Sequence, residues 1–210
     1  MLTRTELWLI VILGAGLTLL GLLIQGKSLS IAGVATTLGT TVALLYGGIW
    51  LFDSYLWRWS IFRGWLVNRP YLQGSWAATL HSDWIDPETN ERVPPIEAYM
   101  VVRQTLTSLS MRLFTEKSRS ALVAHAIETE PDGLFQLSAV YRNYPKIEYQ
   151  GKQSSIHHGA LLIDVHEVRQ ERLEGHYWTD RETRGTVVLE RRVAKLFSSF
   201  DEARSALQGG

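Results

Sequence analysis

The sequence predicts two N-terminal transmembrane helices followed by an all-β domain, an eight-stranded up-and-down β-barrel with a short C-terminal helix. Two long apolar stretches without charge, residues 7–24 and 28–52, precede Pro70. Beyond Pro70 the apolar pattern becomes alternating, in eight strand-length segments separated by turn sequences. The pattern divides the chain into a two-helix transmembrane hairpin at 1–60, an interfacial linker at 61–70 and a barrel domain at 71–210.

Both apolar stretches have the length of a membrane span. At about 1.5 Å per residue, residues 7–24 reach roughly 27 Å, close to the thickness of the hydrocarbon core. Residues 31 to about 52 are also long enough, and an aromatic belt suited to the interface follows: Trp50, Tyr55, Trp57 and Trp59. The alternative for the first stretch is a cleaved signal peptide, which Arg4 and several small residues would suit. A second apolar stretch so soon after the first favours the hairpin.

Basic residues predict the orientation of the hairpin. The connecting turn carries only Lys27, whereas the outer ends carry Arg4, Arg58, Arg63 and Arg69. The positive-inside rule therefore places both ends, and the barrel domain with them, in the cytoplasm.

Small residues recur at a spacing of four along the second apolar stretch: Ala35, Gly39, Ala43 and Gly47. Small residues on one face let helix backbones approach closely in lipid. This small-residue stripe either packs the hairpin against itself or packs one protomer against another, and the second alternative makes it an oligomerisation surface. Both can hold.

The barrel domain begins where Arg69-Pro70 stops a helix. The expected strands are residues 74–82, 96–103, 108–115, 120–128, 134–142, 156–165, 173–180 and 185–192, and a helix is expected over 194–207. Turn sequences are marked at 86–90, 130–133 and 181–185. An eight-stranded barrel has room for one small ligand. Gly74-Ser75-Trp76 resembles the Gly-x-Trp that opens lipocalin barrels, so Trp76 is interpreted as a structural plug of one barrel end.

The composition argues against several functions. Basic and acidic residues number 21 each, so no nucleic-acid polymer is expected as a partner. The chain has no cysteine, which excludes disulfides and thiolate metal sites. It contains no His-Glu-x-x-His, Gly-x-Ser-x-Gly or phosphate-loop motif. We therefore expect no enzyme, no catalytic residue, no metal and no cofactor.

Aromatic, hydroxyl and arginine side chains within the expected strands suggest a binding site for a planar, anionic ligand. Aromatic rings stack on bases, and guanidinium groups match phosphate oxygens. The candidate ligand-binding residues are Tyr99, Arg103, Thr105, Arg112, Tyr141, Asn143, His158, Tyr177, Thr179 and Arg181. Strand parity groups Tyr177, Thr179 and Arg181 on one face and Tyr141 with Asn143 on another, but it does not say which face is inside. The alternative for each is a half-buried sheet residue, a turn residue or an exterior ion-pair partner.

Five stretches carry a resemblance to a known family: Tyr71-Leu72-Gln73-Gly74-Ser75-Trp76, Arg103-Gln104-Thr105-Leu106, Tyr141-Arg142-Asn143-Tyr144-Pro145, His157-His158-Gly159-Ala160 and Gly175-His176-Tyr177-Trp178-Thr179-Asp180-Arg181. Together with the order of helices and strands, they resemble the two-transmembrane, β-strand-rich effectors of CBASS, the bacterial cyclic-oligonucleotide anti-phage signalling systems. The resemblance implies a cytoplasmic β-barrel that senses a cyclic dinucleotide. It also implies a homo-oligomer whose helices disrupt the bilayer of the bacterial inner membrane.

Two other functions fit the same sequence. The Gly-x-Trp opening and the barrel size would suit a membrane-tethered, lipocalin-like carrier of a hydrophobic small ligand. A barrel filled by its own side chains would be a structural scaffold that binds neither ligand.

Overall fold

The structure is a computed structural model that describes residues 4–24, 26, 31–86, 89–130, 133–151, 154–165 and 172–208. The chain forms two compact units, residues 1–61 and 62–210, and each is described by itself. Parts of the predicted turns lie outside the described residues. These are Gln25, Lys27 and Ser28 between the two predicted spans, Pro87 and Glu88 in the turn at 86–90, and Pro131 and Asp132 in the turn at 130–133.

The N-terminal unit contains two long helices, α1 (Arg4–Ile24) and α2 (Ile31–Ser54), followed by a short 3-10 helix, η1 (Leu56–Arg58); a second one, η2 (Ser60–Phe62), lies at the boundary between the units. Within the described residues, one helical stretch, Val34–Ser54, is long and apolar enough to cross a membrane, and α1 contributes a shorter apolar stretch, Gly14–Ile24. The expected first span over residues 7–24 is a helix whose role as a span stays a prediction.

The two helices meet through one face of α2. Thr37 and Thr41 are buried, and the Leu45 side chain lies opposite Gly14 of α1, where a methyl group would make an ordinary van der Waals contact with it at 3.6 Å. Buried Thr18 and Leu22 belong to the corresponding face of α1. The threonine hydroxyls donate to the carbonyl oxygens one turn earlier, at 2.7 Å for Thr18 and 2.9 Å for Thr41, so no hydroxyl proton is left unpaired in these two side chains.

The small-residue stripe lies on the other face of α2. Ala35, Gly39, Ala43 and Gly47 are all exposed, and no atom would come within 4 Å of a methyl group on Gly39 or Gly47. In this unit, therefore, the stripe does not pack the hairpin against itself.

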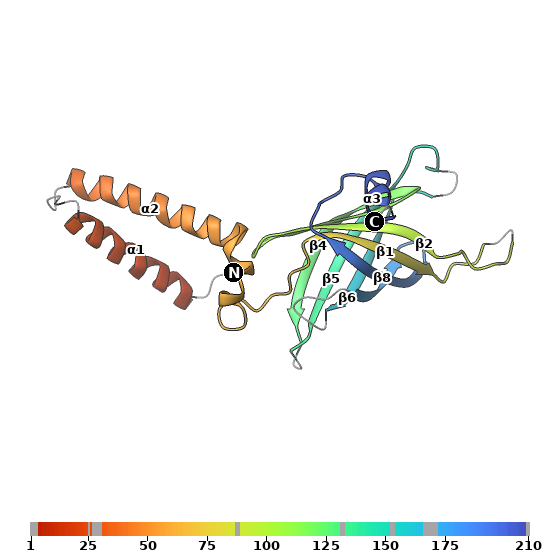
Figure 1. The fold of residues 1–210 in the computed structure, drawn as a ribbon, viewed down its shortest axis with the longest axis horizontal. Helices are drawn as coiled ribbons and strands as arrows, with labels where there is room; N and C mark the ends of the chain where they lie inside the picture. The colour runs from red at the N-terminus through yellow and green to blue at the C-terminus, as the bar shows by residue number, and fades with distance from the viewer. Residues whose placement is uncertain are drawn as a thin grey trace. The chain divides into compact units, whose positions relative to one another are not determined.

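The second unit is a closed barrel in which each strand pairs antiparallel with the next and β8 returns to β1, as predicted (Figure 1). The strands are β1 (Gly74–Ser82), β2 (Ile96–Gln104), β3 (Leu109–Thr115), β4 (Ser118–Thr129), β5 (Phe135–Pro145), β6 (His157–Val165), β7 (Arg172–Thr179) and β8 (Arg184–Val193). All eight agree with the expected segments except at their ends. Alternation of apolar and polar residues was enough to predict the strands, because one face of every strand lines the barrel interior.

The C-terminal helix begins later than the sequence suggested. The expected helix over 194–207 is observed as α3 (Phe200–Gln208). Ser199 caps it, because its hydroxyl accepts the backbone N–H of Glu202 at 3.2 Å, while the Glu202 carboxylate accepts the backbone N–H of Ser198 at 2.9 Å. The Glu202 carboxylate thus bonds the residue before the cap and not the backbone of Ser199 itself, so the pair differs from a capping box, and residues 194–199 remain non-helical ahead of the helix.

Helix α3 covers the outer surface of the barrel at β2. Phe200 packs against Tyr99, with ring centroids 5.4 Å apart, and Ala203 and Leu207 join the same cluster. The buried Ser75 hydroxyl accepts the backbone N–H of Phe197 at 3.1 Å. At Tyr99 and Val101, therefore, β2 is apolar toward α3 as well as toward the interior.

One end of the barrel is filled by side chains. Trp76 is 1% exposed, and its indole N–H donates to the carbonyl oxygen of Leu72 at 3.0 Å. The Arg192 guanidinium lies over its ring, 5.4 Å from the centroid. The buried carboxamide of Gln104 accepts the backbone N–H of Leu72 at 2.8 Å and donates to the carbonyl oxygen of Pro70 at 2.9 Å. Trp76 is therefore the plug that the sequence predicted.

Candidate ligand cavity

The other end of the barrel holds a cavity of about 1150 Å³. Its lining comes from the ends of the strands and from the β1–β2, β3–β4, β5–β6 and β7–β8 connections, so it opens at the end opposite Trp76. Small-molecule pockets usually measure about 300–1,000 Å³, and this one is slightly larger. The inner wall is largely apolar and includes Met100, Met111, Leu161 and Val187.

Three tyrosines line the cavity, and two of them, Tyr141 and Tyr177, each lie over a glycine of the neighbouring strand. Tyr141 on β5 is paired with Gly159 on β6, and Tyr177 on β7 is paired with Gly185 on β8. A methyl group on Gly159 would lie 2.4 Å from the Tyr141 ring and hydroxyl, and one on Gly185 would lie 2.8 Å from the Tyr177 hydroxyl. Glycine at these two positions therefore lets each ring lie against the barrel wall and leaves the space beside it open.

The tyrosine environments are apolar enough to hold both phenols neutral. Burial, followed by the neighbouring Tyr177 and Asp180, raises the pKa of Tyr141 far above its usual value. Burial also raises the pKa of Tyr177, against the opposing effect of a hydrogen bond with Ser82. Both hydroxyls consequently remain hydrogen-bond donors over the physiological range of pH.

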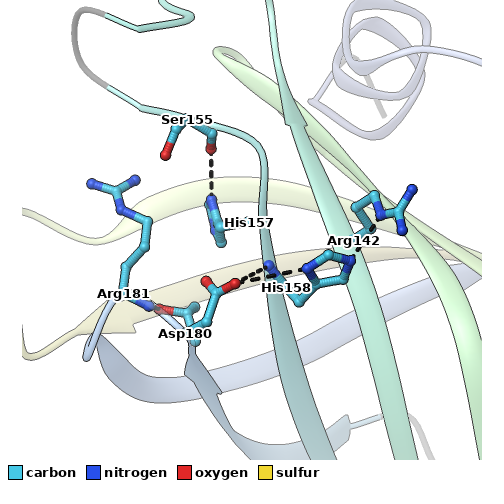
Figure 2. Close-up of polar contacts among 7 residues, drawn as sticks. Arg142, Ser155, His157, His158, Asp180 and Arg181 are labelled. Carbon is cyan, nitrogen blue, oxygen red and sulfur yellow. Dashed lines mark hydrogen bonds and ion pairs between the residues drawn. The ribbon is translucent and has the colours of Figure 1, made fainter.

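Polar side chains form a row across three adjacent strands nearer the mouth. The register pairs Ser120 on β4 with Asn143 on β5, and Asn143 with His157 on β6. The Ser120 hydroxyl donates to Asn143 Oδ1 at 2.9 Å, and both residues are buried. His157 Nδ1 donates to the carbonyl oxygen of Ser155 at 2.9 Å (Figure 2). All three residues line the cavity, and we refer to them as the polar row.

Two cations at the mouth are positioned by the β5–β6 connection. Arg181 Nη1 donates to the hydroxyl of Ser154 at 2.9 Å. The Lys117 ammonium lies over the ring of Tyr149, 5.3 Å from its centroid. Arg181 comes from the β7–β8 connection and Lys117 from the β3–β4 connection, so the same loop braces a cation on each side of it.

Acidic residues line the mouth as well: Glu116 is the sequence neighbour of Lys117, and the others belong to the opposite side. The β1–β2 connection contributes Asp86 and Glu91 together with Arg92. An anionic ligand group would therefore be favoured beside Lys117 and Arg181 rather than beside the β1–β2 connection.

Close to the mouth, a polar cluster faces the outside of the barrel. Arg142 Nε donates to His158 Nε2 at 2.8 Å, and the backbone N–H of His158 donates to Asp180 Oδ2 at 3.0 Å (Figure 2). All three residues are exposed. This cluster ties β5, β6 and the end of β7 together beside the mouth without lining the cavity.

Half of the candidate ligand-binding residues meet at the cavity. Its lining includes Tyr141, Asn143, Tyr177, Thr179 and Arg181. Thr179 shares a hydrogen bond of 2.7 Å with Thr183 on the β7–β8 turn, and its hydroxyl also accepts the backbone N–H of Arg181 at 3.2 Å. That these five contact a ligand remains a prediction.

The other five candidates lie away from the cavity: Tyr99, Arg103, Thr105, Arg112 and His158. Tyr99 packs under α3, where burial and then a hydrogen bond to Glu97 raise its pKa to about 12. Arg103 and Arg112 are exposed, and Thr105 lies in the β2–β3 connection at the filled end. His158 belongs to the outer cluster, and its neighbour His157 lines the cavity instead.

Several cavity residues were not predicted from the sequence. Ser120 and His157 alternate with the outward residues of their strands, but parity cannot tell inside from outside. Lys117, Tyr149 and Ser154 lie in connections, where no periodicity applies. The register that places Ser120 and His157 beside Asn143 follows from the strand pairing and not from any single segment of the sequence.

An antiparallel barrel that is plugged at one end and open at the other onto a cavity with aromatic, amide and cationic groups defines a small-molecule receptor or carrier. Comparison with known proteins identifies the class more closely. The model of the Cap15 cyclic dinucleotide receptor domain matches residues 67–191, which span the described barrel up to β8. The chain therefore belongs to the Cap15 family of CBASS effectors, as its sequence motifs predicted.

A curated relative agrees with this assignment. The chain is 26% identical over 142 residues to CD-NTase-associated protein 15 of Staphylococcus schleiferi, covering 67% of this chain and 70% of that protein.

In the described residues, no three His, Asp or Glu side chains gather as a metal site would require.

Proposed function

We propose that this protein is an anti-phage effector of the bacterial inner membrane whose cytoplasmic barrel binds a cyclic dinucleotide in the cavity opposite Trp76. Binding promotes assembly of several copies, and their paired helices, α1 and α2, then disrupt the bilayer. The protein acts as a receptor and carries out no reaction on its ligand. Family membership supports the ligand class, and the cavity supports the place where it binds.

The observation that carries the proposal is the combination of two wall-bound tyrosines with two braced cations in one cavity. A cyclic dinucleotide has two bases, which stack on aromatic faces, and two phosphates, which need cationic partners. Tyr141 and Tyr177 provide the faces, and Arg181 and Lys117 provide the charges. Stacking contributes about 1–3 kcal/mol per base, so two rings suffice for a substantial affinity.

The exposed small-residue stripe supports assembly through the helices. Ala35, Gly39, Ala43 and Gly47 lie on the face of α2 that α1 leaves uncovered. In lipid such a face gains by packing closely against another helix. The proposal therefore assigns the stripe to contacts between protomers.

The coupling between barrel and helices needs little free energy per copy. A ligand shifts an assembly equilibrium only by its differential affinity for the assembled state. A tenfold preference supplies about 1.4 kcal/mol per site, and these increments add over the protomers of an assembly.

The test is a thermal melt of the full chain in lipid nanodiscs against a panel of cyclic dinucleotides. At about 100 times Kd, a true ligand should raise the free energy of unfolding by about 2.7 kcal/mol, which corresponds to a rise of roughly 5–10 °C in Tm. Tyr141→Ala should abolish the rise. Absence of a rise with every cyclic dinucleotide would contradict the proposal.

The membrane step is tested separately in cells. Gly39→Leu or Ala43→Leu should abolish growth arrest on activation while leaving the ligand-induced rise in Tm unchanged, because a bulky side chain blocks close helix packing. Retained growth arrest would show that the stripe is not the assembly surface.

A lipocalin-like carrier is the second candidate, favoured by the apolar inner wall of Met100, Met111, Leu161 and Val187. It predicts that a fatty acid raises Tm and displaces a fluorescent apolar probe, whereas no cyclic dinucleotide does so.

A further inference from the structure

Strand β4 is paired unequally with its two neighbours. It pairs with β5 along its whole length, from Ser118 to Thr129. With β3 it pairs only through residues 119–121, so no strand of the described chain pairs with residues 122–129 on that side. A β-bulge at Val123 lies where β4 leaves β3, and a bulge bends the strand that carries it. We refer to residues 122–129 as the open edge.

The open edge presents backbone groups that no strand pairs. In an antiparallel pair, every second residue bonds the neighbouring strand through both its N–H and its C=O, and the residues between direct both groups to the other side. Every second residue of the open edge therefore directs these groups away from β5. Val123 is 58% exposed, and Ala124, His125 and Ala126 are exposed as well, so the described part of the chain leaves this stretch uncovered.

The sequence of the open edge lacks two features that usually protect an edge strand. Lysine and proline, which discourage pairing with another chain, are both absent from it. Residues 120–127 also contain no Asp, Glu or Arg, and Glu128 is the first acidic residue after them. An uncharged, exposed edge of this length is a template on which a further strand can pair.

The order of side chains in the open edge indicates that a second copy of this chain supplies the further strand. Residues 123–127 read Val-Ala-His-Ala-Ile, which is nearly the same in both directions. If an identical strand lies antiparallel with His125 on the two-fold axis, Ala124 faces Ala126 of the other copy and Val123 lies beside Ile127. Small residues then oppose small ones and β-branched residues oppose each other, as a self-complementary interface requires.

We propose that the open edge is an interface between two copies of this chain, in which β4 pairs antiparallel with β4 and His125 of each copy lies at the two-fold axis. The sheet then continues from one barrel into the next. Because β4 runs from the mouth to the plugged end, the antiparallel partner has its mouth on the far side, and both cavities stay open. This interface goes beyond the function proposed above and does not depend on which ligand the cavity takes.

The open edge extends to the end of the barrel at which the preceding chain enters. The β4–β5 connection is at the plugged end, and so is the junction at which Gln104 bonds Pro70 and Leu72. The two copies therefore adjoin at the ends that lead to their N-terminal helices. A single two-fold contact stops at a dimer, so a larger assembly needs a second surface, and the small-residue stripe of α2 is the one proposed above.

Single cysteines test the interface directly, because the chain has none of its own. The full-length His125→Cys variant is reconstituted in liposomes of phosphatidylethanolamine and phosphatidylglycerol and oxidised with copper phenanthroline. Residues opposed across an antiparallel pair have Cα atoms about 4.5–5.5 Å apart, which a disulfide can span. A covalent dimer should form about 10 times faster or more than with His176→Cys. His176 is the matched control, because it is an exposed histidine on β7, which is paired on both sides.

Charge exchange at the same position is the second measurement and needs no oxidation. His125→Glu and His125→Lys each place like charges opposite one another across the two-fold axis. Each variant alone should therefore self-associate about 2–5-fold more weakly than the wild type. A mixture of the two variants places opposite charges together and should restore association, measured as energy transfer between labelled copies in the same liposomes. His176→Glu and His176→Lys should change nothing, alone or mixed.

Both measurements are made without ligand and with each cyclic dinucleotide of the panel above, and a response in either condition supports the interface. Crosslinking of His125→Cys no faster than that of His176→Cys would overturn the inference. Equal association of the two charge variants and of their mixture would overturn it as well. If the interface fails while a cyclic dinucleotide still raises Tm, the receptor function stands. If no cyclic dinucleotide raises Tm, the receptor function fails, and crosslinking without ligand still decides the interface.

Discussion

The two ends of the barrel are built from the same eight strands, yet they are used in opposite ways. At the filled end the inward side chains are large and apolar, as at Trp76, Leu137 and Ile163, each 1% exposed. At the open end the inward positions of the same strands carry tyrosine, asparagine, serine and threonine around a cavity of about 1150 Å³. Because apolar burial is the main source of stability, the filled end supports the fold and leaves the open end available for binding.

This contrast between the two ends predicts where substitutions should act. Changes at the filled end should alter the free energy of unfolding and affect binding only through it. Changes at the open end should alter affinity at nearly constant stability. Three substitutions test this division, and a fourth in α3 provides a comparison outside both ends; they are taken from the largest expected effect to the smallest.

Trp76→Ala should give the largest effect and should act on stability. Removing a fully buried indole leaves a void and should cost about 3–5 kcal/mol, lowering Tm by roughly 10 °C or more. Trp178→Ala is the matched control, because Trp178 points outward and is 46% exposed. Thermal melts of both variants in nanodiscs measure the effect. Equal losses would mean that the filled end is not the main support of the fold.

Gly159→Ala should act on both properties, because it forces a methyl group to within 2.4 Å of Tyr141 and 2.7 Å of the Trp178 carbonyl oxygen. Relieving this overlap should cost about 1–3 kcal/mol of stability. It should also tilt the Tyr141 ring into the cavity and lower cyclic dinucleotide affinity more than 10-fold. Calorimetry and thermal melts check the two effects. Ala160→Ser, one residue further and outward-facing, should leave both nearly unchanged; unaltered binding in Gly159→Ala would speak against a ligand beside Tyr141.

Arg181→Ala should act on binding alone. Loss of one cation near a phosphate should weaken every cyclic dinucleotide about 10-fold, or about 1.4 kcal/mol, and reduce the salt dependence of binding. Tm without ligand should stay within about a degree, because Arg181 is exposed. Arg112→Ala removes an equally exposed arginine from the outer face of β3 and should leave affinity unchanged. If Arg112→Ala lowered the affinity by the same factor, the phosphates would have to bind outside the cavity.

Glu202→Gln should have the smallest effect and should depend on pH. Hydrogen bonds from the backbone and side chain of Ser198, together with Lys195, lower the pKa of Glu202 from 4.5 to about 2. The ionised carboxylate therefore stabilises the fold above about pH 4.5, and this contribution is lost as the pH falls toward 2. Wild-type Tm should exceed that of Glu202→Gln at pH 7, and the two should converge in acid. A difference that persists at pH 2 would assign the effect to something other than ionisation.

The strands and the barrel were predictable because alternation of apolar and polar residues reports a closed sheet with one buried face. Trp76 was recognised as a plug from the Gly-x-Trp motif at the start of β1. The start of α3 was not predicted correctly, because residues 194–199 have no strong helix breaker and the capping residues Ser199 and Glu202 were overlooked.

The candidate site was predictable only in part, for a physical reason. Parity correctly grouped Tyr141 with Asn143 and Tyr177 with Thr179, but it could not choose the inner face. On β2 the choice was harder still, because α3 buries the outer face at Tyr99 and makes both faces apolar. Lys117 and Ser154 come from connections, whose positions depend on how the strands are joined in space and not on any repeat in the sequence.

The Gln104 carboxamide, which bonds the backbone at both Pro70 and Leu72, fixes where the preceding chain joins the barrel. That junction is at the plugged end, so the mouth of the cavity is at the far end from the attachment. Strand β2 joins the two ends directly, because it runs from Ile96 at the cavity to Gln104 at the junction.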